Sequence, residues 1–515
     1  MTIVSVRKAA RGLVRFFALA AVMAVASPAM AANYPLELVS PRAAGTSPAA
    51  GFAAMPSGHR IFKAYPGVPY NIRAVVIGGA YPYTFSLGNA PAGMSINSET
   101  GEITWASPGG TTATPTITVR DAEGSQQSSS WTISVTTAGF RFIDQARGSA
   151  GGSGTIDNPW QSLSQLHASS APGEIVYFRA GTYRSDGIAR TSVGTAWERV
   201  EFNGARHPMA WIAYPGEKPV IDFGYIAGSD PSALIRFQAT SSTPLYLDGL
   251  EGRNFRNIGF QVISGSNDYT VIRRLRVHDM ILGVDGENPA GIMFTSNYSD
   301  ATQYGAVQDS EFFDLNNGGG LKLYSHMKLL VEDNVFRDSG GGFDLKAHLP
   351  RFEVRGNVFQ HLPAYVLFGN MNNGSPGEPA TGEIRFNNVN TPNSLWSLDV
   401  NQDGMAREIY VYRNTLVGRV RVRNVDGTDG PFRFYSNVIV NSESGTPSGS
   451  RIVQEAVSDP SRVVINNNLV GSPSEGMVDA NGLLTDAYQR YVGSVGHQLG
   501  VGSPIPLPPS GLSVQ

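Results

Sequence analysis

Apolar and polar positions recur in phase along the second half of the chain. The pattern VEDNVF at 331–336 returns as VRGNVF at 354–359, and more loosely around Asn388, Asn414, Asn437 and Asn468. Successive asparagines are 23, 31, 26, 23 and 31 residues apart. One coil of a parallel β-helix takes about this length, with loop insertions in some coils. We therefore predict a ladder of asparagine side chains at one turn of each coil. Asparagine-rich loops of an unrelated β-sandwich would not keep phase with the apolar positions.

Three strands come into register when the coils are aligned on that asparagine. They are GIMFTSN at 291–297, GLKLYSH at 320–326 and GFDLKAH at 342–348. Strand side chains alternate between two faces, so every second residue points into the core. The expected core residues are Ile292, Phe294, Leu321, Leu323, Phe343 and Leu345. The expected outward columns are Met293, Lys322 and Asp344, then Thr295, Tyr324 and Lys346, with His326 and His348 at the strand exits.

Shorter alternating runs precede this region. Strands are predicted at 83–87, 103–105, 116–119 and 131–135, a spacing typical of a small sandwich over residues 61–137. APAGMSI at 90–96 and TGEI at 100–103 resemble the immunoglobulin-like and cadherin-like modules of bacterial surface proteins. The resemblance implies a spacer or an accessory that contacts carbohydrate. Residues 32–60, rich in Ala, Pro, Gly and Ser, are expected to be a linker or a loosely attached first strand.

The start of the solenoid has its own signature. WQSL at 160–163 and PGEIVYFRAGTY at 172–183 are similar to the opening of many extracellular β-helix proteins, where a short amphipathic helix, here at about 160–168, caps the first coil. A terminal coil exposes an unpaired edge and an apolar core end, which must be covered. The predicted fold class is all-β: a right-handed parallel β-helix over residues 138–495, preceded by the small immunoglobulin-like β-sandwich. A Pro-rich tail, 496–515, follows.

The N-terminus predicts the compartment. Arg7, Lys8, Arg11 and Arg15 form a basic region, Phe16–Ala26 is apolar, and Ala29-Met30-Ala31 offers small residues for cleavage. This is the layout of a signal peptide over residues 1–31, and no later apolar run is long enough to span a membrane. We expect a secreted monomer in the periplasm or at the cell surface of a bacterium.

Charge and cysteine content narrow the partners and the chemistry. Residues 1–31 hold four of the 39 basic residues and none of the 42 acidic ones, so their removal changes the formal net charge from −3 to −7. An acidic chain is a poor partner for nucleic acid. The absence of cysteine excludes disulfides, thiolate zinc sites and a cysteine nucleophile.

The outward columns bring acidic and basic side chains together. Adjacent coils are about 4.8 Å apart, so these columns and the two histidines are expected to form one patch. Cleavage of a uronate chain by β-elimination requires neutralising the carboxylate, removing the C5 proton and protonating the leaving oxygen. Lys346 beside Lys322 has its ammonium form disfavoured and is the candidate base, and Tyr324 or a histidine would handle the second proton. Alternatively, these exposed charges only solubilise the wall.

At these residues the chain resembles the β-helix polysaccharide lyases of the alginate lyase and chondroitinase B family. Those enzymes place a Lys and an Arg one coil apart, the Arg in a Leu-Arg-His-Gly context ahead of Gly-Asn-x-Phe. Here LKAH at 345–348 precedes GNVF at 356–359, with Lys in place of Arg and Ala347 inserted before the histidine. The resemblance implies lyase activity at the patch. The catalytic candidates are Lys346, Tyr324, His348 and His326, and the substrate-binding candidates are Lys322, Asp344, Arg351 and Arg274.

Calcium is a further candidate ligand. DVNQDG at 399–404 matches the first half of a calcium loop, with Asp399, Asn401 and Asp403 as oxygen ligands, but Tyr410 stands where such loops have a bidentate Glu. An ordinary Asp-Gly turn joining two coils fits equally. GFDL at 342–345 is also similar to β-helix pectate lyases that bind calcium through clustered aspartates, yet the neighbouring aspartates are absent. The predicted chemistry requires no cofactor.

Three classes of function remain open. The first is a secreted lyase that cleaves an acidic, uronate-containing polysaccharide or exopolysaccharide by β-elimination. A β-helix glycoside hydrolase would need two acidic residues flanking the bond, whereas the strand exits carry Asn297, His326 and His348. The third is a non-catalytic, polysaccharide-binding or adhesin-like surface protein with the sandwich as a spacer. All three predict a polysaccharide partner.

Overall fold

A computed structural model describes most of the chain from residue 32 to residue 471. The described ranges are 32–49, 53–193, 197–224, 233–240, 242–263, 269–282, 288–295, 303–324, 327–345, 351–363, 365–370, 380–391, 396–401, 406–426, 430–440, 452–466 and 468–471. The expected signal peptide at 1–31 and tail at 496–515 lie outside them, as do residues 472–495 of the expected solenoid.

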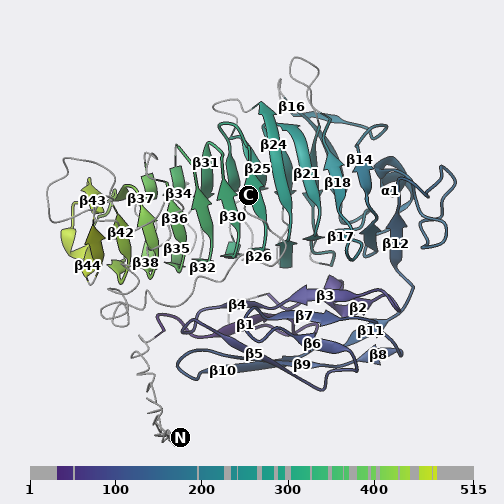
Figure 1. Cartoon of the computed structure of the whole chain (residues 1–515), viewed down its shortest axis with the longest axis horizontal. Helices are drawn as coiled ribbons and strands as arrows, with labels where there is room; N and C mark the ends of the chain where they lie inside the picture. The colour runs from purple at the N-terminus through teal and green to yellow at the C-terminus, as the bar shows by residue number, and fades with distance from the viewer. Residues whose placement is uncertain are drawn as a thin grey trace, which may run out of the picture.

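The larger part of the chain is a right-handed parallel β-helix of three sheets (Figure 1). Sheet 1 consists of β12 (Phe140–Ile143), β13 (Ile175–Phe178), β17 (Ala210–Ala213), β20 (Tyr246–Asp248), β23 (Tyr269–Arg273), β26 (Gln303–Gln308), β29 (Met327–Glu332), β32 (Arg351–Arg355), β35 (Ala380–Arg385), β38 (Ala406–Tyr412), β41 (Phe432–Tyr435) and β44 (Val463–Asn466). Sheet 2 consists of β14 (Gly181–Tyr183), β18 (Pro219–Asp222), β21 (Glu251–Arg256), β24 (Arg276–Leu282), β27 (Glu311–Phe313), β30 (Val335–Arg337), β33 (Val358–Gln360), β36 (Asn388–Asn390), β39 (Thr415–Val417), β42 (Val438–Val440) and β45 (Leu469–Gly471). Sheet 3 consists of β15 (Thr191–Val193), β16 (Trp197–Asn203), β19 (Ala233–Gln238), β22 (Ile258–Ile263), β25 (Ala290–Thr295), β28 (Gly319–Tyr324), β31 (Gly341–Leu345), β34 (Tyr365–Asn370), β37 (Trp396–Asn401), β40 (Val420–Arg423) and β43 (Ile452–Glu455). Each coil runs from sheet 1 through sheet 2 to sheet 3.

The inward side chains of the three sheets form one continuous apolar core. The six residues expected to point inward from β25, β28 and β31 are all at most 1% exposed, which confirms the alternation in these strands. Aromatic rings also stack from coil to coil. Phe312 and Phe336 have centroids 5.0 Å apart, and Phe336 and Phe359 have centroids 4.8 Å apart. The core therefore repeats with the coil, as the sequence period requires.

A short helix covers the first coil, as predicted. Helix α1 (Leu163–Ser169) begins after Ser162, whose Oγ accepts a hydrogen bond from the Gln165 amide at 3.3 Å. Such an N-cap satisfies one of the amides that the first helical turn leaves unpaired. Leu163 and Leu166 are fully buried in the solenoid core. The helix thus closes the apolar end of the first coil.

The asparagine ladder runs along the corner between sheets 1 and 2. The amide nitrogen of each ladder residue donates to the side-chain oxygen of the next, at 2.8–3.0 Å, in the order Asn334, Asn357, Asn387, Asn414, Asn437 and Asn468. One position differs from the prediction, because Asn387 rather than Asn388 belongs to the ladder. Asn388 pairs in register with Val358 and is the first residue of β36.

This neighbouring pair provides a matched test of the ladder. Asn387 donates to Val354 O, Arg385 O and Asn414 Oδ1, and its oxygen accepts from Asn357. Asn387→Ala is expected to lower the free energy of unfolding by about 1–3 kcal/mol, because buried ladder partners lose their hydrogen bonds. Asn388→Ala should have a smaller effect, since Asn388 Oδ1 has no hydrogen-bond partner among the described residues. Urea denaturation measures both; an equal or larger loss for Asn388→Ala would contradict the assignment.

The N-terminal domain is a sandwich of eleven strands, more than the four predicted. They are β1 (Glu37–Ser40), β2 (Lys63–Ala64), β3 (Tyr70–Arg73), β4 (Val75–Ile77), β5 (Thr84–Gly88), β6 (Met94–Ile96), β7 (Glu102–Trp105), β8 (Thr112–Ala113), β9 (Thr116–Arg120), β10 (Gln126–Ser130) and β11 (Ile133–Val135). The segment 32–60 does contain a first strand, but that strand is not loosely attached. β1 pairs antiparallel with β4, and Leu36, Leu38 and Val39 are buried in the sandwich core.

The sandwich packs lengthwise against sheet 1 of the β-helix (Figure 1). Tyr269, Tyr304, Ala306 and Leu330 of sheet 1 belong to the same apolar cluster as the sandwich core. The outer face of sheet 1 is therefore covered over these coils. A spacer on a flexible tether would bury no such surface, so the module is a docked domain.

Candidate functional site

The predicted patch lies on the outer face of sheet 3. Lys322 on β28 is in register with Met293 on β25 and with Asp344 on β31. Tyr324 is in register with Thr295. The outward columns expected from the sequence therefore exist in the described strands. Sheet 3 is not the sheet that packs against the sandwich, so the domain interface leaves this patch untouched.

Lys322 and Asp344 are more buried than the sequence suggested. Lys322 is 7% exposed and Asp344 is 3% exposed, although both occupy outward positions of the sheet. Lysine and aspartate are rarely buried to this degree unless their charges are paired. The expectation that these residues are exposed charges that only solubilise the wall is therefore wrong for both.

Tyr324 has a fixed orientation. Its hydroxyl donates a hydrogen bond to Asn288 Oδ1 at 2.6 Å. Its ring packs against an apolar cluster on the outer side of sheet 3, formed by Leu234, Ile258, Ala290 and Met293. One side of the patch is thus apolar and the other is charged. A surface of this kind can contact the apolar ring face of a sugar and its polar groups together.

The remaining catalytic candidates lie outside the described residues. Lys346 and His348 follow Leu345, the last residue of β31, and His326 follows Tyr324, the last residue of β28. Their roles therefore stay predictions from the sequence. The described part of the patch supplies one amine, one carboxylate and one phenol, contributed by two adjacent coils.

The calcium interpretation meets a different arrangement. Asp399 and Asn401 lie in strand β37 rather than in a loop or turn, and Asp403 is outside the described residues. Both oxygens of Asp399 accept hydrogen bonds from guanidinium groups. Oδ2 accepts from Arg421 Nη2 at 2.6 Å and from Arg423 Nη2 at 3.2 Å, and Oδ1 accepts from the Nε atoms of the same two arginines at 3.1 Å and 3.2 Å. A carboxylate that already neutralises two arginines is a poor calcium ligand. Within the described part of the chain, no three His, Asp or Glu side chains are grouped to hold a metal.

Sequence reasoning missed an arginine stripe beside that aspartate. The run RVRVR at 419–423 alternates strictly, which would have placed its arginines on one face of a strand. The Cζ atoms of Arg419 and Arg421 lie 4.4 Å and 4.0 Å from the ring centroid of Trp396. Arg421 also pairs with Glu455 at 2.8 Å. The stripe extends the charged outer face of sheet 3 by further coils.

Two predicted substrate-binding arginines lie elsewhere. Arg351 is on β32 of sheet 1, and its guanidinium stacks on the ring of Tyr34, 3.4 Å from Cζ to the centroid. Arg274 is at the corner after β23 and donates to Asp248 Oδ1 at 2.7 Å. Neither belongs to sheet 3, so neither is part of the patch. Both expectations are wrong for this patch, because Arg351 lies on sheet 1 and Arg274 at the corner that follows a strand of sheet 1.

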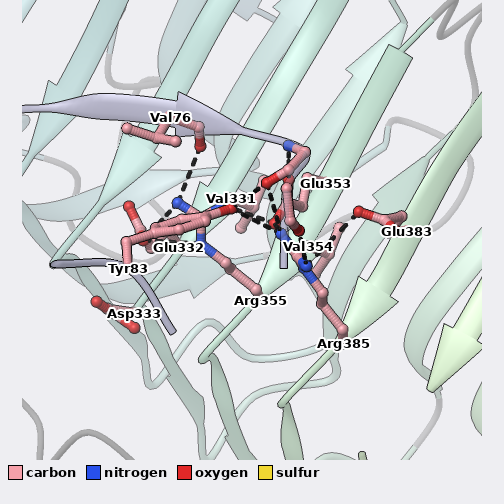
Figure 2. Close-up of polar contacts among 12 residues, drawn as sticks. Val76, Tyr83, Val331, Glu332, Asp333, Glu353, Val354, Arg355, Glu383 and Arg385 are labelled. Carbon is pink, nitrogen blue, oxygen red and sulfur yellow. Dashed lines mark hydrogen bonds and ion pairs between the residues drawn. The ribbon is translucent and has the colours of Figure 1, made fainter. Parts of the chain in front are cut away.

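The neighbouring basic residues serve the domain interface instead (Figure 2). Arg355 pairs with Glu332 at 2.7 Å and with Glu353 at 2.5 Å, and it donates to Val76 O of the sandwich at 2.9 Å. Arg385 pairs with the same Glu353 and donates to Tyr83 Oη at 2.7 Å. Buried charges of this kind act between the two domains and have no path to a substrate.

Comparisons with known proteins agree with the architecture. A family model described as "Putative Ig domain" matches residues 57–136. These residues are an immunoglobulin-like domain. No curated protein matches the chain. Among the residues that the structure covers, no helix has the length and apolar character needed to cross a membrane.

Several solved structures are similar to the chain. A pectate lyase, Pel9A, has 13% identity and a TM-score of 0.36, covering 68% of this chain and 82% of its own. A rhamnogalacturonan lyase has 15% identity and a TM-score of 0.37, with coverages of 67% and 95%. A family 28 exopolygalacturonase from Yersinia enterocolitica has 13% identity and a TM-score of 0.35, with coverages of 82% and 98%. At these TM-scores the activities in the names remain those of the other proteins.

Proposed function

We propose that this chain is a secreted polysaccharide lyase that cleaves an acidic, uronate-containing polysaccharide by β-elimination on the outer face of sheet 3. The main support is the pair Lys322 and Asp344, an amine and a carboxylate in register on adjacent coils and at most 7% exposed. Strongly buried ionisable groups on an outer wall are typical of functional sites rather than of solvated surfaces.

Each residue of the proposed site would carry out one part of the elimination. Lys322 would neutralise the substrate carboxylate, which makes the C5 proton more acidic. Lys346 would remove that proton, the electron pair would form the C4–C5 double bond, and the C4–O bond would break. Tyr324, or a histidine at the strand exit, would protonate the leaving oxygen. The Tyr324 proton now bonds to Asn288 Oδ1 and would have to change partner in that step.

The residues on the outer face of sheet 3 support hydrolysis less well than elimination. Asp344 on β31 and Asp399 on β37 occupy equivalent register positions, with β34 between the two strands, so two carboxylates do lie on one face. An inverting hydrolase needs one of its two acids as a proton donor and the other as a base. Asp399 accepts hydrogen bonds from Arg421 and Arg423 on both of its oxygens, so these two arginines already occupy the carboxylate.

One experiment separates the classes of function. The purified protein is incubated with a panel of acidic and neutral polysaccharides, and ultraviolet absorbance and reducing ends are followed together. Elimination produces a new unsaturated uronate and therefore a rise in absorbance. New reducing ends without that rise indicate hydrolysis. Binding with neither signal indicates the non-catalytic alternative and contradicts the proposal.

Lys322→Ala is expected to weaken substrate binding more than turnover. A cation that pairs with the uronate carboxylate does so in the ground state as well as the transition state, so its loss mainly raises KM. We expect KM to rise by at least about tenfold, the equivalent of one hydrogen bond to a charged group. Steady-state kinetics on a confirmed substrate measure this. A fall in kcat with an unchanged KM would contradict the assigned role.

A further inference from the structure

Sheet 1 and the sandwich meet through ion pairs and hydrogen bonds of buried charged side chains. This interface is separate from the proposed site. The sandwich contributes the Arg73 side chain and the backbone of residues 76–79. Glu353 Oε2 accepts from Gly78 N at 2.9 Å, and Arg385 donates to Gly79 O at 2.8 Å. Gly78 has φ +69°, and a Cβ there would lie 2.0 Å from Pro35 O. A side chain at this position would clash with the segment that precedes β1, so this backbone conformation requires glycine.

Three carboxylates converge on the single guanidinium group of Arg73 at one end of this interface. Arg73 Nη2 lies 2.5 Å from Asp333 and 3.4 Å from Glu332, and Arg73 Nη1 contacts Asp309. Two other arginines lie near this group. Arg355 pairs with Glu332 and is shared with Glu353, and Arg273 lies 3.6 Å from Asp309 and is shared with Asp248. The side chains of Asp309, Glu332 and Asp333 are all at most 14% exposed, so water screens their mutual repulsion little.

We propose that this cluster is a proton-operated latch, in which protonation of Asp333 relieves the excess of carboxylates around Arg73 and tightens the docking of the sandwich on sheet 1. The groups that face Asp333 are Arg73 from β3, Glu332 from β29, Asp309 from the corner after β26, and the Tyr81 ring from the turn before β5. Arg73 is the single cation among them, and it already serves two other acids.

The direction of the pH effect follows from the electrostatics of two groups. Burial raises the pKa of Asp333 to about 6; Arg73 opposes this shift, while Glu332 and Asp309 add to it. Docking stability from Asp333 is thus fully present below its ordinary pKa of 3.8 and is lost as the pH rises through about 6. Burial would also raise the pKa of Glu353, but Arg355 and Arg385 outweigh it and lower this pKa to about 2. Stability from Glu353 is therefore present above 4.5 and is lost as the pH falls toward 2.

Docking is therefore expected to be tightest in mild acid. Between pH 8 and pH 5, proton uptake by Asp333 should increase the docking equilibrium constant by about tenfold. The chain has no cysteine, so a pair of dyes can be attached at Ser86→Cys on the sandwich and Lys218→Cys on the β-helix, both exposed positions. Energy transfer between the dyes in the full chain then reports separation of the two domains in urea.

The test compares the urea midpoint of separation at pH 8 and pH 5. The wild-type midpoint should be higher at pH 5, and Asp333→Asn should have one midpoint at both pH values. Asp338→Asn is the matched control, because Asp338 is 38% exposed and lies on the next corner of the same coil; it should keep the wild-type response. An unchanged wild-type midpoint, or a wild-type response in Asp333→Asn, overturns the proposal. If Asp333→Asn does not fold, the wild-type titration alone decides.

Discussion

Glu353→Ala is expected to lower the free energy of unfolding by about 3–5 kcal/mol, the loss typical of breaking a buried ion pair from one side. The Glu353 side chain is fully buried. Its Oε1 accepts from both Arg355 and Arg385, and its Oε2 accepts from the Gly78 amide of the sandwich. Alanine would leave two buried guanidinium groups without their shared partner. Urea denaturation at neutral pH measures the change.

Two further variants make that result specific. Glu353→Gln keeps an acceptor for the Gly78 amide but removes the charge. Its free energy of unfolding should therefore lie between those of wild type and Glu353→Ala. Glu455→Ala is the matched control, because Glu455 also pairs with an arginine but its side chain is 54% exposed. Exposed ion pairs contribute about 0–1 kcal/mol. A loss below about 1 kcal/mol for Glu353→Ala would show that the ion pairs and hydrogen bonds of Glu353 do not hold the domains together.

The solenoid could be predicted because its signal is local and repeated. Asn334 and Asn357 sit in nearly the same six-residue pattern, and each coil has to satisfy the same inward and outward alternation. The error at Asn388 arose where the pattern offers two adjacent asparagines, so the sequence could not decide which one faces the corner. Register on sheet 3 followed correctly, because one aligned residue per coil fixes all the others.

The domain interface had no such signal. Arg73 and Asp309 are 236 residues apart, and Arg385 and Gly79 are 306 residues apart. Neither contact has a period, a spacing or a motif, since docking depends on the shapes of two finished domains. Arg351 therefore looked like an exposed group suited to a glycan, whereas its guanidinium stacks on Tyr34 of the N-terminal domain.

Two of the three residues proposed as calcium ligands lie in a setting that their spacing did not indicate. The spacing of Asp399, Asn401 and Asp403 suits a calcium loop only if the backbone turns there. Asp399 and Asn401 instead lie two residues apart in an extended strand, where side chains share a face. That face meets the alternating arginines of the next coil, and Arg421 is in register with Asp399. The secondary structure, not the residue types, decided the chemistry.

Lys346→Ala is expected to lower turnover by at least about 100-fold on a confirmed substrate, the low end of the contribution of a general base. Lys346 directly follows Leu345, the last residue of β31, and this strand also carries Asp344 of the patch. Removing a base whose task is confined to proton abstraction should lower kcat while leaving the melting temperature unchanged. Stopped-assay kinetics and a thermal melt measure the two quantities on the same sample.

Conservative variants distinguish a base from a binding cation at Lys346. Lys346→Arg keeps the positive charge, but a guanidinium is not deprotonated in proteins and so cannot accept the C5 proton. Turnover should therefore stay as low as in Lys346→Ala, whereas a role in binding alone would be largely restored by arginine. Lys218→Ala, an exposed lysine in a turn ahead of sheet 2, should keep normal turnover. Near-normal turnover in Lys346→Ala would remove the sheet 3 patch as the active site.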